Sequence, residues 1–222
     1  AVLMPSCIYV DGKPFGRGSS LSGNGEIESR SIALPDYHRV VAERGVVVEL
    51  VDTSYHQLTV SADSNVMPYV VVTADGGDLC VTIDKAVRRV GDINVRVKLP
   101  KNSKIEHLQA SSDAEIEILS PLEGMPKLGI NTSSAAEIRG EVNSPEITIA
   151  AASASEVDMT LSCDKLTVSA SSASEVELRG VATKGEFMTA SAADIDSSEL
   201  QTDYLKVLAA SAGEASVFCT RH

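Results

Sequence analysis

LTVSASSASEVELRG, residues 166–180, contains the pattern that decides the fold. An apolar-x-apolar segment is followed by a run of Ser and Ala, an acidic residue and a second apolar-x-apolar segment. The pattern occurs six times, and each time an acid follows seven positions after an apolar residue. The spacings between successive acids are 22, 19, 19, 19 and 20 residues, and the acids are Glu115, Glu137, Glu156, Glu175, Asp194 and Glu214. A period close to 20 residues is typical of a solenoid.

Within each repeat, apolar residues alternate with other residues. In the quoted segment Leu166, Val168 and Ala170 form one alternating set, and Val176 and Leu178 form a second. A period of two indicates a strand with one buried face, and two short strands in 19 residues leave no room for a helix. A leucine-rich repeat has a similar length, but its Asn/Cys ladder is absent. We therefore predict an all-β fold, a single-stranded right-handed parallel β-helix (a solenoid) with about 19–22 residues per coil in the C-terminal half.

The corners of the coil are predicted from small residues, glycine and proline. The Ser/Ala run is expected at one corner, because small side chains allow neighbouring coils to stack closely. Arg139-Gly140 and Arg179-Gly180 are expected at the opposite corner, where glycine supplies backbone freedom. Pro121 and Pro145 are also expected at corners.

One β-helix domain is predicted over residues 26–222, after a flexible lead-in of Gly, Ser and Pro over residues 1–25. Residues 26–104 are expected to form less regular coils, and residues 105–222 contain the six regular repeats. In the N-terminal section, strands are predicted at 27–34, 37–43, 46–51, 56–61, 69–73, 79–84 and 92–99. The last coil is expected to present a strand edge that the final residues or another chain must cover.

Composition excludes some classes of partner. The formal net charge is −12, which argues against nucleic acid, since phosphate binding requires a basic surface. No segment reaches the roughly 20 apolar residues that a transmembrane helix needs. Aromatic residues make up only 4% of the chain and Trp is absent, so stacking platforms for sugars are scarce.

The four cysteines, Cys7, Cys80, Cys163 and Cys219, match no metal-ligand spacing. Free thiols are the predicted state, and a disulfide between two of them is the alternative. The opening AVLMPSC (residues 1–7) makes Cys7 a candidate for lipid attachment. Because Met4-Pro5-Ser6 is a poor lipobox, a disordered end or a leader remnant is the preferred interpretation.

Several pieces of the chain, taken in order, resemble the head-GIN domain family. They are SIALPDYHRVVAERGVVVEL (31–50), LTVSADSNVMPY (58–69), LCVTI (79–83) and VRVKLP (95–100), followed by the repeats SASSASEVEL (169–178) and ASAADID (190–196). This family of unknown function is also described as auto-transporter adhesins and is common in the Bacteroidetes. The resemblance spans about residues 28–217 and implies an all-β right-handed helix in an exported, envelope-associated protein, with no established catalytic residues. The chain differs in having Ser or Ala where relatives often have Gly.

The column of six acids is the sharpest candidate site. In-register stacking would place its carboxylates about 4.8 Å apart, and neighbours would repel by ~0.8 kcal/mol per pair in water. The column must therefore face solvent or hold cations. A solvated edge is the preferred interpretation and a Ca²⁺ column is the alternative. Glu117 and Glu177 add charge on the same strands, but the GGxGxD calcium repeat is absent. No other cofactor is predicted.

No catalytic residues are predicted. His38, His56, His107 and His222 are scattered, and neither HExxH nor GxSxG occurs. Arg139 and Arg179 are interpreted as corner residues rather than as catalytic cations of a polysaccharide lyase. The Ser/Thr/Ala ladders would form a flat face for binding a polysaccharide or another β-surface, although packing at a bend is the simpler interpretation.

We therefore expect an exported, non-enzymatic protein of the periplasm or cell surface that presents a repetitive β-face to a glycan or an envelope protein. One alternative is a polysaccharide-processing enzyme of the β-helix type. Another is a self-associating structural module, a homo-oligomer joined through the exposed end of the β-helix.

Overall fold

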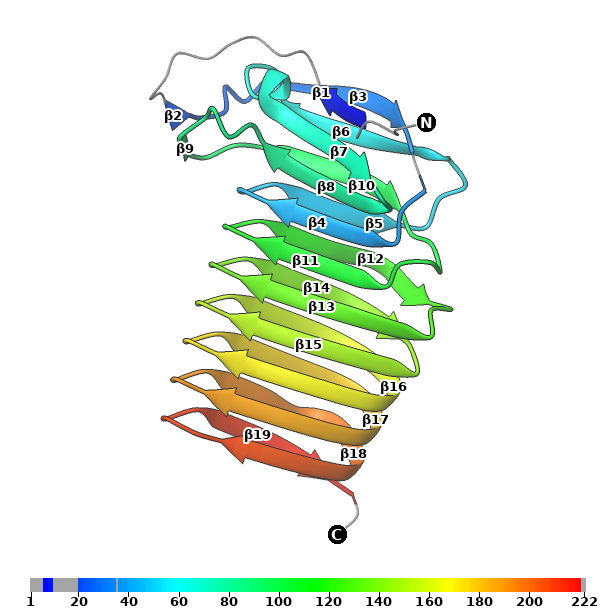
Figure 1. Ribbon diagram of the computed structural model, residues 1–222, viewed down its shortest axis with the longest axis vertical. Coiled ribbons are helices and arrows are strands. Elements are labelled where there is room, and N and C mark those ends of the chain that lie inside the picture. The colour runs from blue at the N-terminus through cyan, green and yellow to red at the C-terminus, as the bar shows by residue number, and fades with distance from the viewer. Residues whose placement is uncertain (1–5, 10–19, 35, 221–222) are drawn as a thin grey trace.

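The computed structural model describes residues 6–9, 20–34 and 36–220, and it confirms the predicted parallel β-helix. Coils stack along one axis from the N-terminal strands to β19, as Figure 1 shows. Within the described ranges, the single helical element is the 3₁₀ turn η1 (Met67–Tyr69). No helix in these ranges has the length and apolarity needed to cross a membrane.

Each coil contributes one strand to each of two facing sheets. One sheet contains β5 (Val47–Val51), β12 (Glu115–Glu123), β14 (Glu137–Asn143), β19 (Glu214–Cys219) and the first halves of β16 (Glu156–Ser171), β17 (Glu175–Ala190) and β18 (Asp194–Ala209). The other contains β8 (Asp78–Ile83), β4 (Arg39–Glu43), β11 (His107–Ser111), β13 (Lys127–Ser133), β15 (Glu146–Ala152) and the second halves of β16, β17 and β18. Neighbouring coils pair in parallel, and the same repeat position is aligned from coil to coil.

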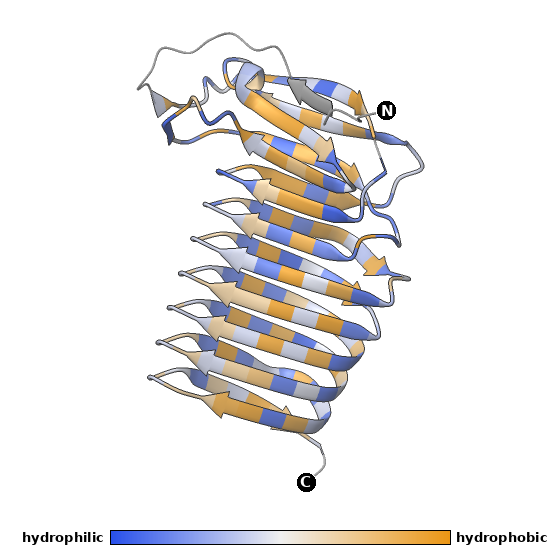
Figure 2. Ribbon diagram, viewed as in Figure 1, coloured by the Kyte–Doolittle hydropathy of each residue, from blue (hydrophilic) through white to orange (hydrophobic). Residues whose placement is uncertain are grey.

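The core lies between these two sheets, because every second residue of each strand points inward. Figure 2 shows this alternation of hydrophobic and hydrophilic residues along the strands. The register aligns one buried column of Leu108, Ile130, Ile149, Val168 and Phe187. The large ring of Phe187 fills space beside Gly185, since a Cβ on that glycine would lie 3.3 Å from Phe187 Cε1.

The Ser/Ala runs form one corner of each coil, as predicted. At each corner two successive residues adopt left-handed backbone angles, for example Ser172 (φ 58°) and Ala173 (φ 60°). This conformation costs a non-glycine residue roughly 1–2 kcal/mol. Hydrogen bonds between coils offset that cost: the N–H of Ala154 donates to the carbonyl of Ser172 (3.0 Å), and the N–H of Ala173 donates to Ser191 (3.1 Å). Inside the corner, the buried Ser174 hydroxyl donates to the carbonyl of Ala151 at 3.0 Å.

The prediction that Arg139-Gly140 and Arg179-Gly180 mark the opposite corner is wrong. Both pairs lie within strands, in β14 and β17. Their glycines are required by close packing instead, since a Cβ on Gly180 (φ +108°) would lie 2.1 Å from the carbonyl oxygen of Leu161. The expectation for Pro121 is also wrong, because it lies in β12 where the register with β14 shifts. Pro145, between β14 and β15, does lie at a corner.

The strands predicted before residue 104 are present, but several pair antiparallel. β3 (Ile27–Ala33) pairs antiparallel with β6 (Gln57–Asp63), which in turn pairs antiparallel with β10 (Val95–Pro100). β7 (Val70–Asp75) pairs antiparallel with β8 and with β1 (Ser6–Tyr9). These strands close the N-terminal end of the stack (Figure 1).

The segment expected as a flexible lead-in is described at residues 6–9 and 20–25, and the rest of it lies outside the described residues. β2 (Ser20–Leu21) pairs with β9 (Arg89–Val90), and Leu21 is buried. The two described pieces therefore belong to the folded structure.

Candidate functional site

The six acids of the repeat lie side by side on one face of the solenoid. The register pairs Glu115 with Glu137, Glu137 with Glu156, Glu156 with Glu175, and then continues through Asp194 to Glu214. Two further columns run beside this one, and together they define the acidic face. Its thirteen carboxylates face four cations, Arg96, Lys98, Arg139 and Arg179. The carboxylates are Glu49, Glu115, Glu117, Glu137, Glu141, Glu156, Asp158, Glu175, Glu177, Asp194, Asp196, Glu199 and Glu214. Most of the net negative charge of the chain is therefore concentrated on this face.

Arg139 neutralises the upper region of the acidic face. Its guanidinium lies 2.7 Å from Glu115 and 3.2 Å from Glu137, and it donates a hydrogen bond to Glu117. The Glu117 side chain is only 9% exposed, and Arg96 of β10 lies 3.5 Å from it. Burial alone would raise the pKa of Glu117, but hydrogen bonds from Arg139 and Glu115 outweigh it and lower the pKa. Glu115 carries the opposite shift, because burial and the neighbouring Glu117 raise its pKa against the attraction of Arg139.

Arg179 has the same role in a coil further along the stack. It lies 2.5 Å from Asp158 and 3.4 Å from Glu199, and it donates a hydrogen bond to Glu177. Both arginines line a groove of about 400 Å³ beside Leu119. Because their guanidinium groups are already occupied by carboxylates, this groove does not offer a ready site for an anion.

We call the first column the outer column; its members are Glu115, Glu137, Glu156, Glu175, Asp194 and Glu214. Away from Arg139, its carboxylates have no cationic partner among the described residues. In the described residues of the chain, no ion pair involves Glu156, Glu175, Asp194 or Glu214. Burial, and then the charges of Glu137 and Glu175, raise the pKa of Glu156. No set of three or more His, Cys, Asp or Glu side chains among the described residues is grouped so as to hold a metal ion. Calcium binding by the column therefore stays a hypothesis.

The opposite face carries a flat strip of small, uncharged side chains. Two adjacent columns in register run over β11, β13, β15 and the second half of β16. We call them the small-residue strip; its members are Gln109, Asn131, Ala150, Ser169, Ser111, Ser133, Ala152 and Ser171. All of them except Ser111 line a shallow groove of about 340 Å³. Ion pairs between neighbouring coils, such as Lys165–Glu146 at 2.6 Å and Lys127–Glu106 at 3.6 Å, border the strip.

The cysteines and histidines do not form a reactive centre in the described residues. Cys80 and Cys163 are free thiols, as predicted. Burial raises the pKa of Cys80 to about 11 and that of Cys163 to about 12, so both thiols are protonated at neutral pH. His38, His56 and His107 are exposed. His222 and the side chain of Cys7 lie outside the described residues, so lipid attachment at Cys7 stays the less favoured alternative of the sequence analysis.

The sequence predicted the first acidic column and the added charge of Glu117 and Glu177, but not the full breadth of the charged face. The second column was visible as an acid two positions after the first, at Glu117, Asp158, Glu177 and Asp196. The role of Arg139 and Arg179 was missed because each stands before a glycine, which suggested a turn.

Comparison with known proteins agrees with this architecture. The family model described as "Putative auto-transporter adhesin, head GIN domain" matches residues 36–222. No curated protein matches the chain. A solved structure from Parabacteroides distasonis, called a "putative lipid binding protein", has a TM-score of 0.80 and 20% identity, covering 91% of this chain and 86% of that one. A "putative adhesin" from Parabacteroides merdae has a TM-score of 0.74 and 21% identity, covering 88% of this chain and 82% of that one. At these identities the likeness concerns the fold alone.

Proposed function

Because the chain belongs to the head GIN domain family of auto-transporter adhesin-like proteins, we propose that it is an exported, non-enzymatic protein of the cell envelope that binds a glycan. The proposed binding surface is the small-residue strip. The protein would act in the periplasm or at the cell surface.

The repetition of the strip is the observation that carries the proposal. Strand spacing places equivalent hydroxyl and amide groups about 4.8 Å apart along the solenoid axis. The strip offers donors and acceptors at Asn131, Ser133, Ser169 and Ser171. Gln109 offers its amide N–H groups, since its side-chain oxygen already accepts a hydrogen bond from Arg39. A polymer with repeating hydroxyl groups can bond to several coils at once, so weak individual contacts add up to useful affinity.

The two faces differ in their suitability for a ligand. On the acidic face the arginines are occupied and the remaining carboxylates repel one another, whereas the strip is uncharged and shallow. Its low charge means that few ions must be desolvated on binding. The scarcity of aromatic side chains supports a surface that binds by hydrogen bonds rather than by stacking.

A glycan array followed by calorimetric titration tests the proposal. Ser169→Arg places a bulky charge in the middle of the strip and should abolish binding. The matched control is Thr160→Arg, an exposed residue on the acidic face, and it should bind like the parent. Binding that survives Ser169→Arg but fails in the control would move the site to the acidic face.

An assay with acidic polysaccharides separates binding from processing. The proposal predicts that such polymers are recovered uncleaved. Appearance of unsaturated or shortened products, lost again on substitution of Arg139 or Arg179, would favour the polysaccharide-processing alternative.

A further inference from the structure

Cations that lack a carboxylate partner gather at one place in the structure. Of the eight arginines in the described ranges, five form ion pairs with Asp or Glu: Arg30, Arg39, Arg96, Arg139 and Arg179. The other three, Arg44, Arg88 and Arg89, form no ion pair with any described residue, and neither does Lys85. Three of these four cations lie within residues 85–91, a segment without an acid that we call the basic loop.

The basic loop is tied to the N-terminal end of the solenoid. It lies between β8 and β10 and contains β9, which pairs with β2 beside the end of the stack (Figure 1). Val87 in the middle of the loop is fully buried. The N–H of Val87 donates to the carbonyl of Asp84 at 3.0 Å, and the N–H of Gly91 donates to the carbonyl of Leu21 at 2.8 Å. The three cations of the loop are nevertheless exposed, so an anchored backbone presents them to solvent.

Arg44 adds a fourth positive charge where the basic loop contacts a corner of the stack. Its guanidinium donates a hydrogen bond to the carbonyl of Val87, and its buried Nε has no hydrogen-bond partner in the described structure. Arg44 has a left-handed φ of 64°, at the corner position where later coils have Ser, such as Ser134 and Ser153. Serine therefore satisfies this corner elsewhere, and the corner beside the basic loop carries a cation instead.

Carboxylates become sparse toward this end of the molecule. The coil that contacts the basic loop has Val47 where the next coil has Glu115, so the outer column begins one coil away. Asp84 and Asp92 flank the loop, and the carboxylate of Asp84 already accepts a hydrogen bond from the N–H of Ala86 at 2.8 Å. Later coils recede by about 4.8 Å each, and physiological salt screens charges over about 8 Å. The basic loop therefore presents positive charge locally, although the chain has a net charge of −12.

The chemistry of these side chains fits phosphate on an extended surface. A guanidinium group donates two parallel hydrogen bonds to a phosphate, and an exposed lysine adds a point charge. Small anions are usually held in concave sites where donors converge. Exposed cations on a loop at one end of an elongated molecule can instead meet many phosphates at once, as a layer of lipid headgroups offers them.

We propose that the basic loop docks the N-terminal end of this protein on an anionic phospholipid surface. Lys85, Arg88 and Arg89 contact the headgroup phosphates, and Arg44 adds its charge behind them. The solenoid then extends away from the lipid, which leaves the small-residue strip and the acidic face accessible. The inference goes beyond the proposed function and does not depend on glycan binding.

Cosedimentation with lipid vesicles tests the docking. The parent should bind vesicles made of equal parts phosphatidylglycerol and phosphatidylcholine but not vesicles of phosphatidylcholine alone, and added NaCl should weaken the binding. The double variant Arg88→Gln, Arg89→Gln should partition roughly 25-fold more weakly, because each cation near an anionic surface contributes roughly fivefold. A parent that does not bind the anionic vesicles at low salt overturns the proposal, and so does equal binding to both kinds of vesicle.

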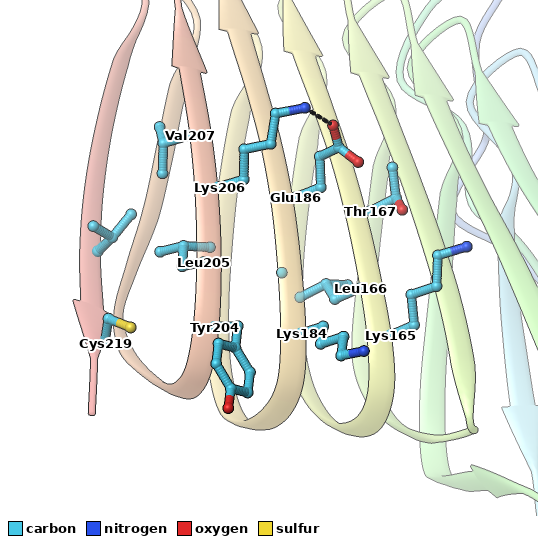
Figure 3. Close-up of a pocket in the computed structure, with 12 residues that line it drawn as sticks. Lys165, Leu166, Thr167, Lys184, Glu186, Tyr204, Leu205, Lys206, Val207 and Cys219 are labelled. Carbon is cyan, nitrogen blue, oxygen red and sulfur yellow. Dashed lines mark hydrogen bonds and ion pairs between the residues drawn. The ribbon is translucent and has the colours of Figure 1, made fainter. Parts of the chain in front are cut away.

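A matched double variant separates local docking from the net charge of the chain. Lys184→Gln with Lys206→Gln removes the same charge from the other end of the stack, where Lys184 is exposed and Lys206 contacts Glu186 at 2.6 Å (Figure 3). This variant should bind vesicles like the parent, and an equal loss in both double variants contradicts a role for the basic loop.

Competition with inorganic phosphate distinguishes a lipid surface from a soluble anion. At constant ionic strength, added phosphate should leave the parent on the anionic vesicles, because a single phosphate contacts few of the cations at once. Displacement by phosphate would mean that the basic loop holds a soluble phosphate ion, and it would overturn the docking proposal.

Discussion

Replacing Glu156 by Gln should stabilise the protein at neutral pH. Glu156 lies in the middle of the uncompensated outer column, and the register places Glu137 and Glu175 on the two adjacent strands. Strands are about 4.8 Å apart, so each neighbouring carboxylate repels Glu156 by about 0.8 kcal/mol in water. Arg139, 3.2 Å from Glu137, and dissolved salt reduce the sum. We expect a gain of about 1 kcal/mol in the free energy of unfolding.

The gain should depend on pH in one direction. Burial and the adjacent carboxylates raise the pKa of Glu156 in the folded protein. A raised pKa means that ionisation destabilises the fold, so the parent loses stability as the pH rises through that pKa. The gain in Glu156→Gln should therefore be present at neutral pH and vanish below the unfolded pKa of about 4.3.

Urea unfolding at neutral and acid pH, at low and high salt, measures this effect. The matched control is Glu146→Gln on the opposite face, where Lys165 at 2.6 Å lowers the pKa of Glu146. That variant loses an attractive ion pair and should gain no stability. A Glu156→Gln protein that is less stable than the parent, or whose gain is the same at both pH values, would refute the idea of a self-repelling column.

Further substitutions test the faces and the buried groups. Val168→Asp should abolish the cooperative unfolding transition, because an unpaired charge in the core costs more free energy than the stability of a typical domain. Glu175→Ala should leave the melting temperature unchanged or raise it. Equal effects of the two substitutions would mean that the inward and outward faces are misassigned. Arg139→Met should lower the free energy of unfolding, measured in urea, by about 2 kcal/mol, because it leaves Glu117 buried without its main partner. The loss is smaller than for a fully buried ion pair, because Arg139 is 48% exposed. The pKa of Glu117 is lowered in the fold, so this loss should shrink as the pH falls through that pKa; a loss that grows in acid would contradict it. Cys163 is half-buried and its pKa is raised to about 12, so it should react with a thiol reagent at mildly alkaline pH much more slowly in the native protein than after unfolding. Equal labelling rates in the two states would show that its pKa is not raised.

The coil and its faces were predictable because the pattern repeats. Alternation in the 166–180 segment marks which residues point inward, and parallel stacking transfers that assignment to every coil. The alignment of Glu137, Glu156 and Glu175 follows from the same period. Local residue chemistry and the global fold agree here, so little tertiary information is needed.

The remaining features depend on contacts that no local pattern encodes. Glycine normally suggests a turn, but Gly180 is required because the backbone of Leu161 approaches it within a strand. Ser172 and Ala173 adopt left-handed angles only because hydrogen bonds between coils support them. The antiparallel pairing of β3 with β6 joins segments about 30 residues apart and depends on how the end of the stack is closed. Such non-local choices are set by tertiary packing rather than by propensity.

A distance between spin labels at positions 115 and 214 tests the in-register stack most directly. These residues stand at the first and last coils of the acidic column, five strand spacings apart. With spin labels at both sites and the native cysteines replaced, double electron–electron resonance spectroscopy should give one narrow distance distribution centred at about 24 Å. A broad distribution, or a centre beyond roughly 35 Å, would contradict a solenoid whose coils align one acid above the next.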